Sequence, residues 1–318
     1  MKSFTLLALT LTCLSFASVQ GAEVSSNRHQ VIAADKGQIV RFDESGKAVW
    51  KCDKVRSVHR IQQLENGNVI VQQGWGKIVE IDPSGEIVWE YNAANSNGNK
   101  GKKLEVHAFQ RLENGNTMIV ENGIGRVIEV DANGKLVHQF NYKVKELHPH
   151  RDVRQAHKLS NGNYLVCHEA DGRVTEYTAD GEIVWDYQVP LFGKEPANGH
   201  GPEAFGNQVF NALRLPNGNT LIATGNGHSV LEVSPEKKIL WEIHQNDLSG
   251  ITLAWVTSLE VLPNGNIIIG NCHAGPENPQ LIEVNRDKEV VWTFRDFENL
   301  GNATAASATV GGIGKVLR

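Results

Sequence analysis

An Asn-Gly-Asn triplet that recurs five times constrains the fold of this chain more than any other feature. Its copies begin 48, 47, 56 and 47 residues apart, at Asn66, Asn114, Asn161, Asn217 and Asn264. A leucine stands two residues before each triplet, and an apolar run such as Val69-Ile70-Val71 follows it. Asn-Gly between apolar runs favours a type I′ turn, which needs positive φ at both central residues. The triplet therefore predicts a β-hairpin at the same place in every repeat.

Each repeat continues with two further apolar runs. The third run ends in a Glu-Val-Asp-like segment, as in Glu80-Ile81-Asp82, and the fourth ends in a tryptophan in most repeats. These tryptophans are Trp50, Trp89, Trp185, Trp241 and Trp292, and His138 takes the place in the remaining repeat. Four strands in a repeat of about 47 residues is typical of a propeller blade. We expect the tryptophans to pack against the neighbouring blade, with His138 as a packing variation.

The two ends of the chain complement each other. The N-terminal segment fits the repeat with its first strand missing, because 29–34, 38–43 and 47–51 match the second, third and fourth runs. A strand predicted over 304–310 would supply the missing one. We therefore predict an all-β fold: a six-bladed β-propeller of four-stranded antiparallel blades, closed by the C-terminal strand within the first blade. A linear β-solenoid is the alternative, although its terminal repeats would be capped.

Composition and the N-terminus indicate an exported single domain. Residues 1–22 have the charged start, apolar stretch and small-residue cleavage site of a signal peptide, which leaves 23–318 as one propeller domain. Without that segment the net charge is −6, which argues against nucleic acid as a partner. No later stretch is long and apolar enough to span a membrane. The remaining cysteines, Cys52, Cys167 and Cys272, form no disulfide framework, and we expect them to be buried.

The two rims of such a propeller differ in this sequence. One rim carries short Asn-Gly-Asn and glycine-containing turns in every repeat. The other carries the variable turns and the long connections 92–105, 141–152 and 188–207. Irregular loops on a rigid scaffold are where binding groups usually lie. The second rim, called the variable rim below, is therefore the candidate functional face.

Candidate residues follow from position on the variable rim. Counting back seven residues from each triplet gives the start of each inner strand, and these residues should surround the axis of the ring: His59, His107, Arg154, Phe210 and Thr257. Adding the nearby aromatic and polar side chains predicts a ligand-binding set of Trp75, Asn122, His148, His150, Arg154, His228, Trp255 and His273. Such imidazoles could act as acid or base, ligate a metal, or bond water. The plain alternative is that they are solvated side chains lining the axis.

No complete catalytic or metal signature is present. His148-Pro149-His150 with His107 matches no recognised ligand spacing, so no metal is predicted. Serine, histidine and aspartate follow no triad order, and no glycine loop of the phosphate-binding type occurs.

The repeats resemble two propeller groups. The segment Glu80 to Trp89 resembles the repeat of pyrroloquinoline-quinone-type propellers, whose tryptophans lock adjacent blades. The segment His107 to Asn116 resembles the His…Leu-x-Asn-Gly-Asn segments of bacterial arylsulfotransferases, which are exported and six-bladed. The first resemblance implies a quinone site, but the chain has too few blades and no adjacent cysteines, so no cofactor is predicted. The second implies a histidine that accepts sulfate with arginine assistance, which only His59, His107 and Arg154 could provide.

These observations predict an exported propeller that binds a ligand or protein through the variable rim, without chemistry of its own. One alternative is sulfuryl transfer at His59 or His107, although neither is followed by the aspartate usual in arylsulfotransferases. The other is a structural propeller in a cell-envelope assembly.

Overall fold

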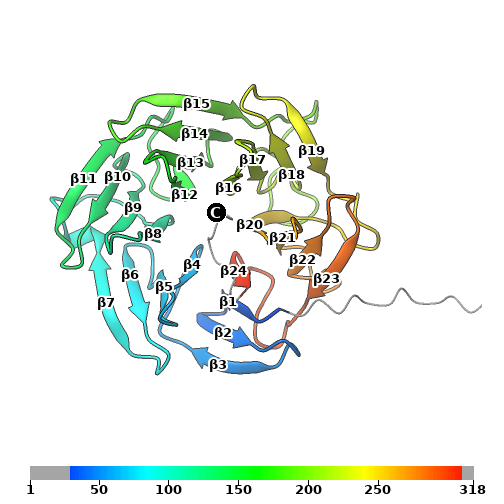
Figure 1. The fold of residues 1–318 in the computed structure, drawn as a ribbon, viewed down its shortest axis with the longest axis horizontal. Helices are drawn as coiled ribbons and strands as arrows, with labels where there is room; N and C mark the ends of the chain where they lie inside the picture. The colour runs from blue at the N-terminus through cyan, green and yellow to red at the C-terminus, as the bar shows by residue number, and fades with distance from the viewer. Residues whose placement is uncertain (1–28, 310–318) are drawn as a thin grey trace, which may run out of the picture.

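Six four-stranded antiparallel sheets form a ring in the computed structural model, which describes residues 29–309. Figure 1 shows the sheets as blades around a common axis, with the first strand of each blade innermost. The predicted six-bladed propeller is thus confirmed. The strands of each blade, from the axis outward, are β24 (Ala306–Thr309), β1 (Val31–Asp35), β2 (Gln38–Phe42), β3 (Ala48–Cys52); β4 (Ile61–Gln63), β5 (Val69–Gln72), β6 (Lys77–Ile81), β7 (Ile87–Asn92); β8 (Phe109–Arg111), β9 (Thr117–Glu121), β10 (Arg126–Val130), β11 (Leu136–Asn141); β12 (Val153–Lys158), β13 (Tyr164–His168), β14 (Arg173–Tyr177), β15 (Ile183–Gln188); β16 (Asn211–Arg214), β17 (Thr220–Ala223), β18 (Val230–Val233), β19 (Ile239–Ile243); and β20 (Trp255–Val261), β21 (Ile267–Cys272), β22 (Leu281–Val284), β23 (Val290–Phe294).

The first blade combines the two ends of the chain. β24 pairs antiparallel with β1, and Val31 stands opposite Thr309. β1 begins two residues later than the segment predicted from the sequence. The predicted signal peptide, residues 1–22, lies outside the described residues. In the part of the chain that is described, no helix has the length and apolar character of a membrane span; one 3₁₀ turn, η1 (Ala93–Asn95), follows β7.

The Asn-Gly-Asn turns have the geometry that the sequence predicts, and they also bind the blade together. Gly67 has φ of 85°, a left-handed conformation that favours glycine. The last asparagine of the same triplet, Asn68, donates from its side chain to Glu80 Oε1 at 2.6 Å. Equivalent bonds at 2.6 Å join Asn163 to Glu176 and Asn219 to Glu232. The glutamate of the third run is thereby fixed by the turn between the first two runs.

Adjacent blades are locked by a repeated contact around the outer tryptophan. Trp185 donates from its indole nitrogen to Pro235 O of the next blade at 3.0 Å. Arg214 of that next blade lies over the Trp185 ring, 5.0 Å from its centroid, and pairs with Glu176 at 2.7 Å. The same set recurs with Trp89, Arg111 and Glu80. The predicted packing of the tryptophans between blades is therefore confirmed; in the variant blade His138 stacks on Tyr164, with ring centroids 6.0 Å apart.

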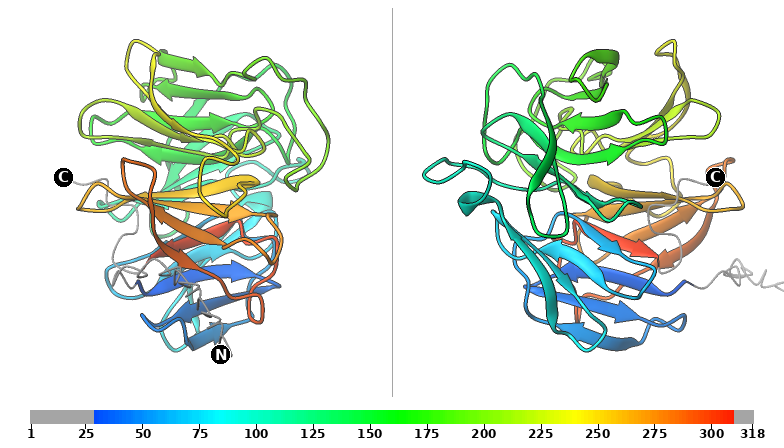
Figure 2. Two further views of the ribbon diagram at one scale, coloured as in Figure 1. Left: turned by 90° about the vertical axis from the view of Figure 1, so that its right-hand side faces the viewer. Right: turned by 60° about the vertical axis from the view of Figure 1, so that its left-hand side comes forward.

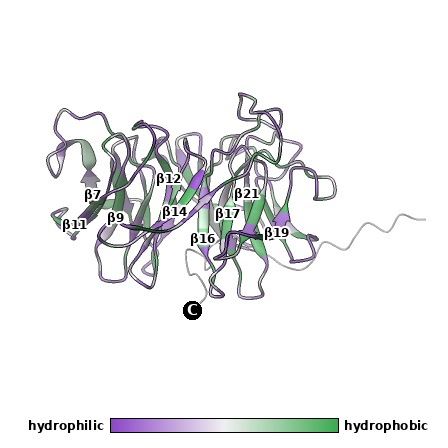
Figure 3. Cartoon of the chain, turned by 90° about the horizontal axis from the view of Figure 1, so that it is seen from above, coloured by the Kyte–Doolittle hydropathy of each residue, from purple (hydrophilic) through white to green (hydrophobic). Residues whose placement is uncertain are grey.

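The apolar core lies between the blades. Figure 3 shows the apolar strands in the middle of the disc and polar loops at both ends, and Figure 2 shows the twisted blades from the side. Val69, Val71 and Ile81 are completely buried, and similar residues fill each interface. Cys52, Cys167 and Cys272 are buried and free, as expected. A rigid core of this kind holds the loops of the variable rim in place.

Candidate functional site

The residues predicted to surround the axis lie at the variable rim, where each inner strand starts. His59 and His107 stand two residues before β4 and β8, and their rings are 4.8 Å apart. Arg154 lies in β12 and contacts His107. Phe210 packs in a separate buried cluster with Trp255, while Thr257 is fully buried within β20. The five positions therefore gather into two groups, one on each side of the axis.

Trp75 is the exposed centre of the first group. Its side chain comes from the turn between β5 and β6, and the residue is 41 % exposed. Its ring lies 5.5 Å from that of His59, 5.6 Å from that of His107 and 5.0 Å from that of His150. A large indole held open to solvent among three imidazoles is a platform for an apolar or planar group. We call these four residues the Trp75 cluster.

A hydrogen bond from Arg154 determines which ring nitrogen of neutral His107 carries the proton. Its guanidinium makes a two-point pair with Glu169, with Nε 2.5 Å from Oε2 and Nη2 3.2 Å from Oε1. The free Nη1 is 3.1 Å from Nδ1 of His107. Arginine only donates hydrogen bonds, so Nδ1 of His107 must accept one. The ring proton of neutral His107 therefore resides on Nε2.

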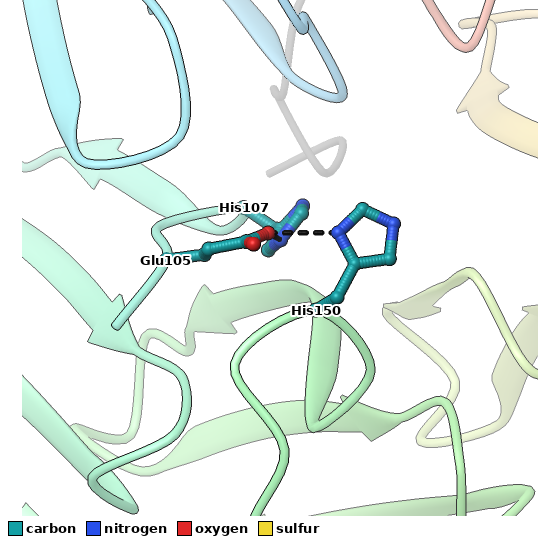
Figure 4. Close-up of side chains that lie close together, drawn as sticks. All are labelled: Glu105, His107 and His150. Atoms are coloured by element: carbon teal, nitrogen blue, oxygen red, sulfur yellow. Dashed lines mark hydrogen bonds and ion pairs between the residues drawn. The ribbon is translucent and has the colours of Figure 1, made fainter. Parts of the chain in front are cut away.

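Glu105 joins His107 to His150. Nε2 of His107 donates to Glu105 Oε2 at 2.9 Å, and Nδ1 of His150 lies 2.7 Å from the same oxygen. Figure 4 shows the carboxylate between the two rings. With Nδ1–H of His150 donated to the carboxylate, Nε2 of neutral His150 keeps its lone pair. The His150 side chain is 39 % exposed, so this nitrogen is an acceptor that a ligand can reach.

The same three side chains are the group of described residues best placed for a metal ion. The ligand atoms of Glu105, His107 and His150 lie within 4.8 Å of one another. A metal on Nε2 of His107 would require the proton to move to Nδ1, which faces a donor of Arg154. The residues therefore fit a hydrogen-bonded relay better than a metal centre. We call Glu169, Arg154, His107, Glu105 and His150 the relay.

Burial and charge hold the inner imidazoles in the neutral form. Burial lowers the pKa of His107 well below its ordinary value, and the Arg154 charge lowers it further. The pKa of His59 is lowered by the same two causes in the same order. Burial raises the pKa of Glu169, which the Arg154 charge opposes. The inner part of the site therefore presents neutral imidazole, a hydrogen-bonding surface, at neutral pH.

A second aromatic group lies across the axis. Trp255, 7 % exposed, has its ring 5.1 Å from that of His200, and His200 lies 5.2 Å from His273. Nδ1 of His273 contacts the Cys272 sulfur at 2.9 Å. His200 belongs to the long connection 188–207, which brings it over the inner strand of the last blade. His200 is exposed, whereas the indole of this group, Trp255, is buried. Among residues 29–309, none of its imidazoles pairs with a carboxylate.

Three of the predicted ligand-binding residues make hydrogen bonds that hold loops together. Asn122 is buried and donates to Val153 O at 2.9 Å. His148 accepts the peptide N–H of His150 at 3.0 Å and so orders that loop. His228 is buried with its ring nitrogens against the carbonyl oxygens of Ala254 and Ala204.

Sequence reasoning did not single out Glu105, Glu169 or His200 as site residues. All three lie in variable segments already assigned to the functional rim, and Glu105 stands two residues before His107. That spacing was the available signal for Glu105. No local pattern indicates the contacts of Glu169 with Arg154 or of His200 with Trp255. These contacts join separate segments that only the folded ring brings together.

Comparison with known proteins places the fold. Residues 35–294 match the PQQ_2 family model, described as outer membrane protein assembly factor BamB, while no curated protein matches the chain. A crystal structure of a protein of unknown function from Bacteroides caccae aligns over 90 % of this chain and 100 % of its own, with 21 % identity and a TM-score of 0.73. A streptogramin B lyase aligns over 87 % and 86 %, with 13 % identity and a TM-score of 0.56. A catalytically inactive variant of virginiamycin B lyase from Staphylococcus aureus with quinupristin aligns over 87 % of each chain, with 11 % identity and a TM-score of 0.55. At these identities the structures show a shared propeller fold.

Proposed function

The chain belongs to the family described as outer membrane protein assembly factor BamB, and we propose that it is an exported propeller that binds its ligand at the Trp75 cluster. The exposed indole of Trp75, held among three imidazoles, carries this proposal. A planar or apolar group would lie against Trp75, and a hydrogen-bond donor on the ligand would reach Nε2 of His150. Export rests on the signal-peptide pattern of residues 1–22.

The relay supports binding because it prepares the site before a ligand arrives. Glu105 orients the His150 ring by its hydrogen bond to Nδ1. Arg154 donates to Nδ1 of His107 and so keeps the ring proton of His107 on Nε2. A side chain already held in its bound conformation loses little entropy when the ligand binds.

The test uses material purified from the native compartment. The protein would be denatured, and the released small molecules and co-purified proteins would be identified by mass spectrometry for wild type, Trp75→Ala and the control Val88→Ala, which changes an exposed side chain on β7. We expect a molecule or protein retained by wild type and Val88→Ala and lost from Trp75→Ala. Equal retention by all three would contradict binding at the Trp75 cluster.

Sulfuryl transfer is the second candidate, and one contact favours His59 over His107 for it. Both nitrogens of His107 are occupied by Arg154 and Glu105, whereas Nδ1 of His59 lies 3.2 Å from Ser57 O, leaving Nε2 as a nucleophile. In this reaction Nε2 would attack the sulfur of an aryl sulfate as the S–O bond to the phenolate breaks, and the sulfuryl group would pass to an acceptor hydroxyl. Incubation with an aryl sulfate and a phenol tests this reaction. If no sulfated phenol and no sulfated histidine are detected, sulfuryl transfer is excluded.

A scaffold role in an envelope assembly is distinguished by the same purification. It predicts proteins that co-purify equally with wild type and Trp75→Ala, and no small molecule released from either.

A further inference from the structure

Arg60, which follows His59 of the Trp75 cluster in the chain, links two blades of the ring. It directly precedes β4 in the second blade, and its Nη1 donates to Oε1 of Gln155, on β12 of the fourth blade, at 2.5 Å. Gln155 donates in turn from Nε2 to His59 O at 2.8 Å. This second bond fixes the amide so that its oxygen faces the guanidinium. Both β4 and β12 are innermost strands of their blades (Figure 1), so the Arg60–Gln155 hydrogen bond joins two blades beside the axis.

Arg60 differs from the other interior arginines in lacking a counter-charge. Arg111, Arg154 and Arg214 each pair with a glutamate, at 3.0, 2.5 and 2.7 Å. Within the described range 29–309, Arg60 takes part in no ion pair, and its buried Nε has no hydrogen-bond partner. Arg41 also pairs with no carboxylate in the described part of the chain, but it donates to Gly67 O and lies over the Trp50 ring. Arg60 has only the single neutral oxygen of Gln155.

The surroundings of Arg60 show the effect of its charge. Burial lowers the pKa of His157 to about 3, and the Arg60 charge acts in the same direction. The His157 ring bonds to the side chain of Asn211 at 3.0 Å. Among the described residues, the amides of Gln155 and Asn211 and the imidazole of His157 are therefore the neutral groups linked to Arg60 by these contacts. A partly buried guanidinium with unused donors has a large unfavourable desolvation energy unless an anion compensates it.

We propose that Arg60, with the amides and imidazole around it, binds a carboxylate or oxyanion group at the centre of the ring. A guanidinium binds such groups through paired hydrogen bonds, and Nε with a terminal nitrogen is the edge that Arg60 leaves unused. The anion could be a free ion or the charged end of a larger molecule. The proposal does not depend on the ligand proposed for the Trp75 cluster, since the anion would bind the side chain of Arg60, and from that cluster only the backbone oxygen of His59 takes part, by holding Gln155.

The first test uses wild-type protein at neutral pH. Sodium sulfate, acetate or benzoate is titrated at constant ionic strength made up with chloride, and the ring signals of His157 are followed by NMR. We expect a saturable shift with at least one of the three anions. Tighter binding of benzoate than of acetate would assign the anion to a larger molecule, and equal binding would assign it to a small free anion. A linear response to all three, equal to that of chloride, would overturn the proposal.

The second test compares matched charge removals four residues apart. Arg60→Gln keeps hydrogen-bond donors but removes the charge, and Arg56→Gln removes one charge from an exposed position. We expect Arg60→Gln to weaken the anion affinity about tenfold or more and Arg56→Gln to leave it unchanged. Equal affinity in the two variants would contradict the site. If Arg60→Gln does not fold, the wild-type titration alone decides, and Trp75→Ala should bind the anion as wild type does.

Discussion

The two rims of the propeller use the same residue types for different purposes. On the Asn-Gly-Asn rim, glutamates are satisfied by contacts that recur from blade to blade, as Glu80 and Glu176 show with their asparagine and arginine partners. On the variable rim, Glu105 and Glu169 make contacts that no other blade repeats within residues 29–309, and these contacts link the partly exposed imidazole of His150 to buried Arg154. The repeated contacts of the Asn-Gly-Asn rim build the scaffold, whereas the contacts that are not repeated lie at the candidate site on the variable rim. Substitutions on the repeated rim should therefore lower stability, whereas substitutions on the variable rim should impair ligand binding.

The largest effect is expected on the repeated rim. Glu176→Ala removes the partner of Arg214 and of the asparagine amides at Asn161 and Asn163. Because a charged group is left unpaired in a partly buried place, the free energy of unfolding should fall by about 3 kcal/mol. Urea unfolding measures this, with Glu182→Ala at an exposed turn of the same blade as the control. A loss equal to that of the control would show that the repeated contact is not what holds the blades.

A smaller effect concerns pH, at the end of β13 nearest the variable rim. Burial lowers the pKa of His168 to about 3, so the folded protein keeps this ring neutral while the unfolded chain takes up a proton near pH 6.5. The free energy of unfolding should therefore fall as the pH drops below 6.5, by about 1.4 kcal/mol per unit for this residue, until the folded pKa is reached.

His168→Gln tests this contribution. Between pH 7.5 and 5 its stability should fall by about 2 kcal/mol less than that of wild type in urea unfolding. Tyr177→Phe, which removes the hydroxyl 2.9 Å from Nε2 but keeps the ring, should retain the wild-type dependence. Identical pH curves for His168→Gln and wild type would contradict the prediction.

The hydrogen bonds of the relay determine which ring nitrogen of His107 and of His150 carries the proton, and they contribute little to the free energy of unfolding. At pH 8, ¹⁵N NMR should find the ring proton of His107 on Nε2 and that of His150 on Nδ1, with no change on adding Zn²⁺. Glu105→Gln should cost about 1 kcal/mol or less and reduce the Nδ1 preference of His150, because an amide oxygen is a weaker acceptor than a carboxylate. A proton on Nδ1 of His107, or a zinc-dependent shift of both rings, would replace the relay with a metal site.

The sequence predicted the repeated part of the molecule better than the site. The Asn-Gly-Asn turns, the four runs and the outer tryptophans each follow from local turn chemistry and a fixed period, and the six blades follow from counting them. Register singled out His59, His107 and Arg154, and the loops of the variable rim added Trp75 and His150; the structure places these five side chains next to one another.

What the sequence could not predict depends on contacts between separate loops. Asn122 and His228 share the rim with the Trp75 cluster, yet their side chains bond to loop carbonyls. Nothing in the local sequence distinguishes an imidazole that binds a carbonyl from one open to a ligand. Arg60 likewise follows His59 in the chain, and only the assembled ring shows that no carboxylate among residues 29–309 pairs with it.

The most direct test of the difference between the rims compares two double variants for the same bound species. Trp75→Ala with His150→Ala changes the variable rim, and Lys135→Ala with Glu182→Ala changes exposed turns of the repeated rim. The affinity for the molecule or protein that co-purifies with wild type would be measured by calorimetry. We expect a loss of about a hundredfold or more for the first variant and wild-type affinity for the second. Equal affinities, or a loss confined to the repeated rim, would contradict it.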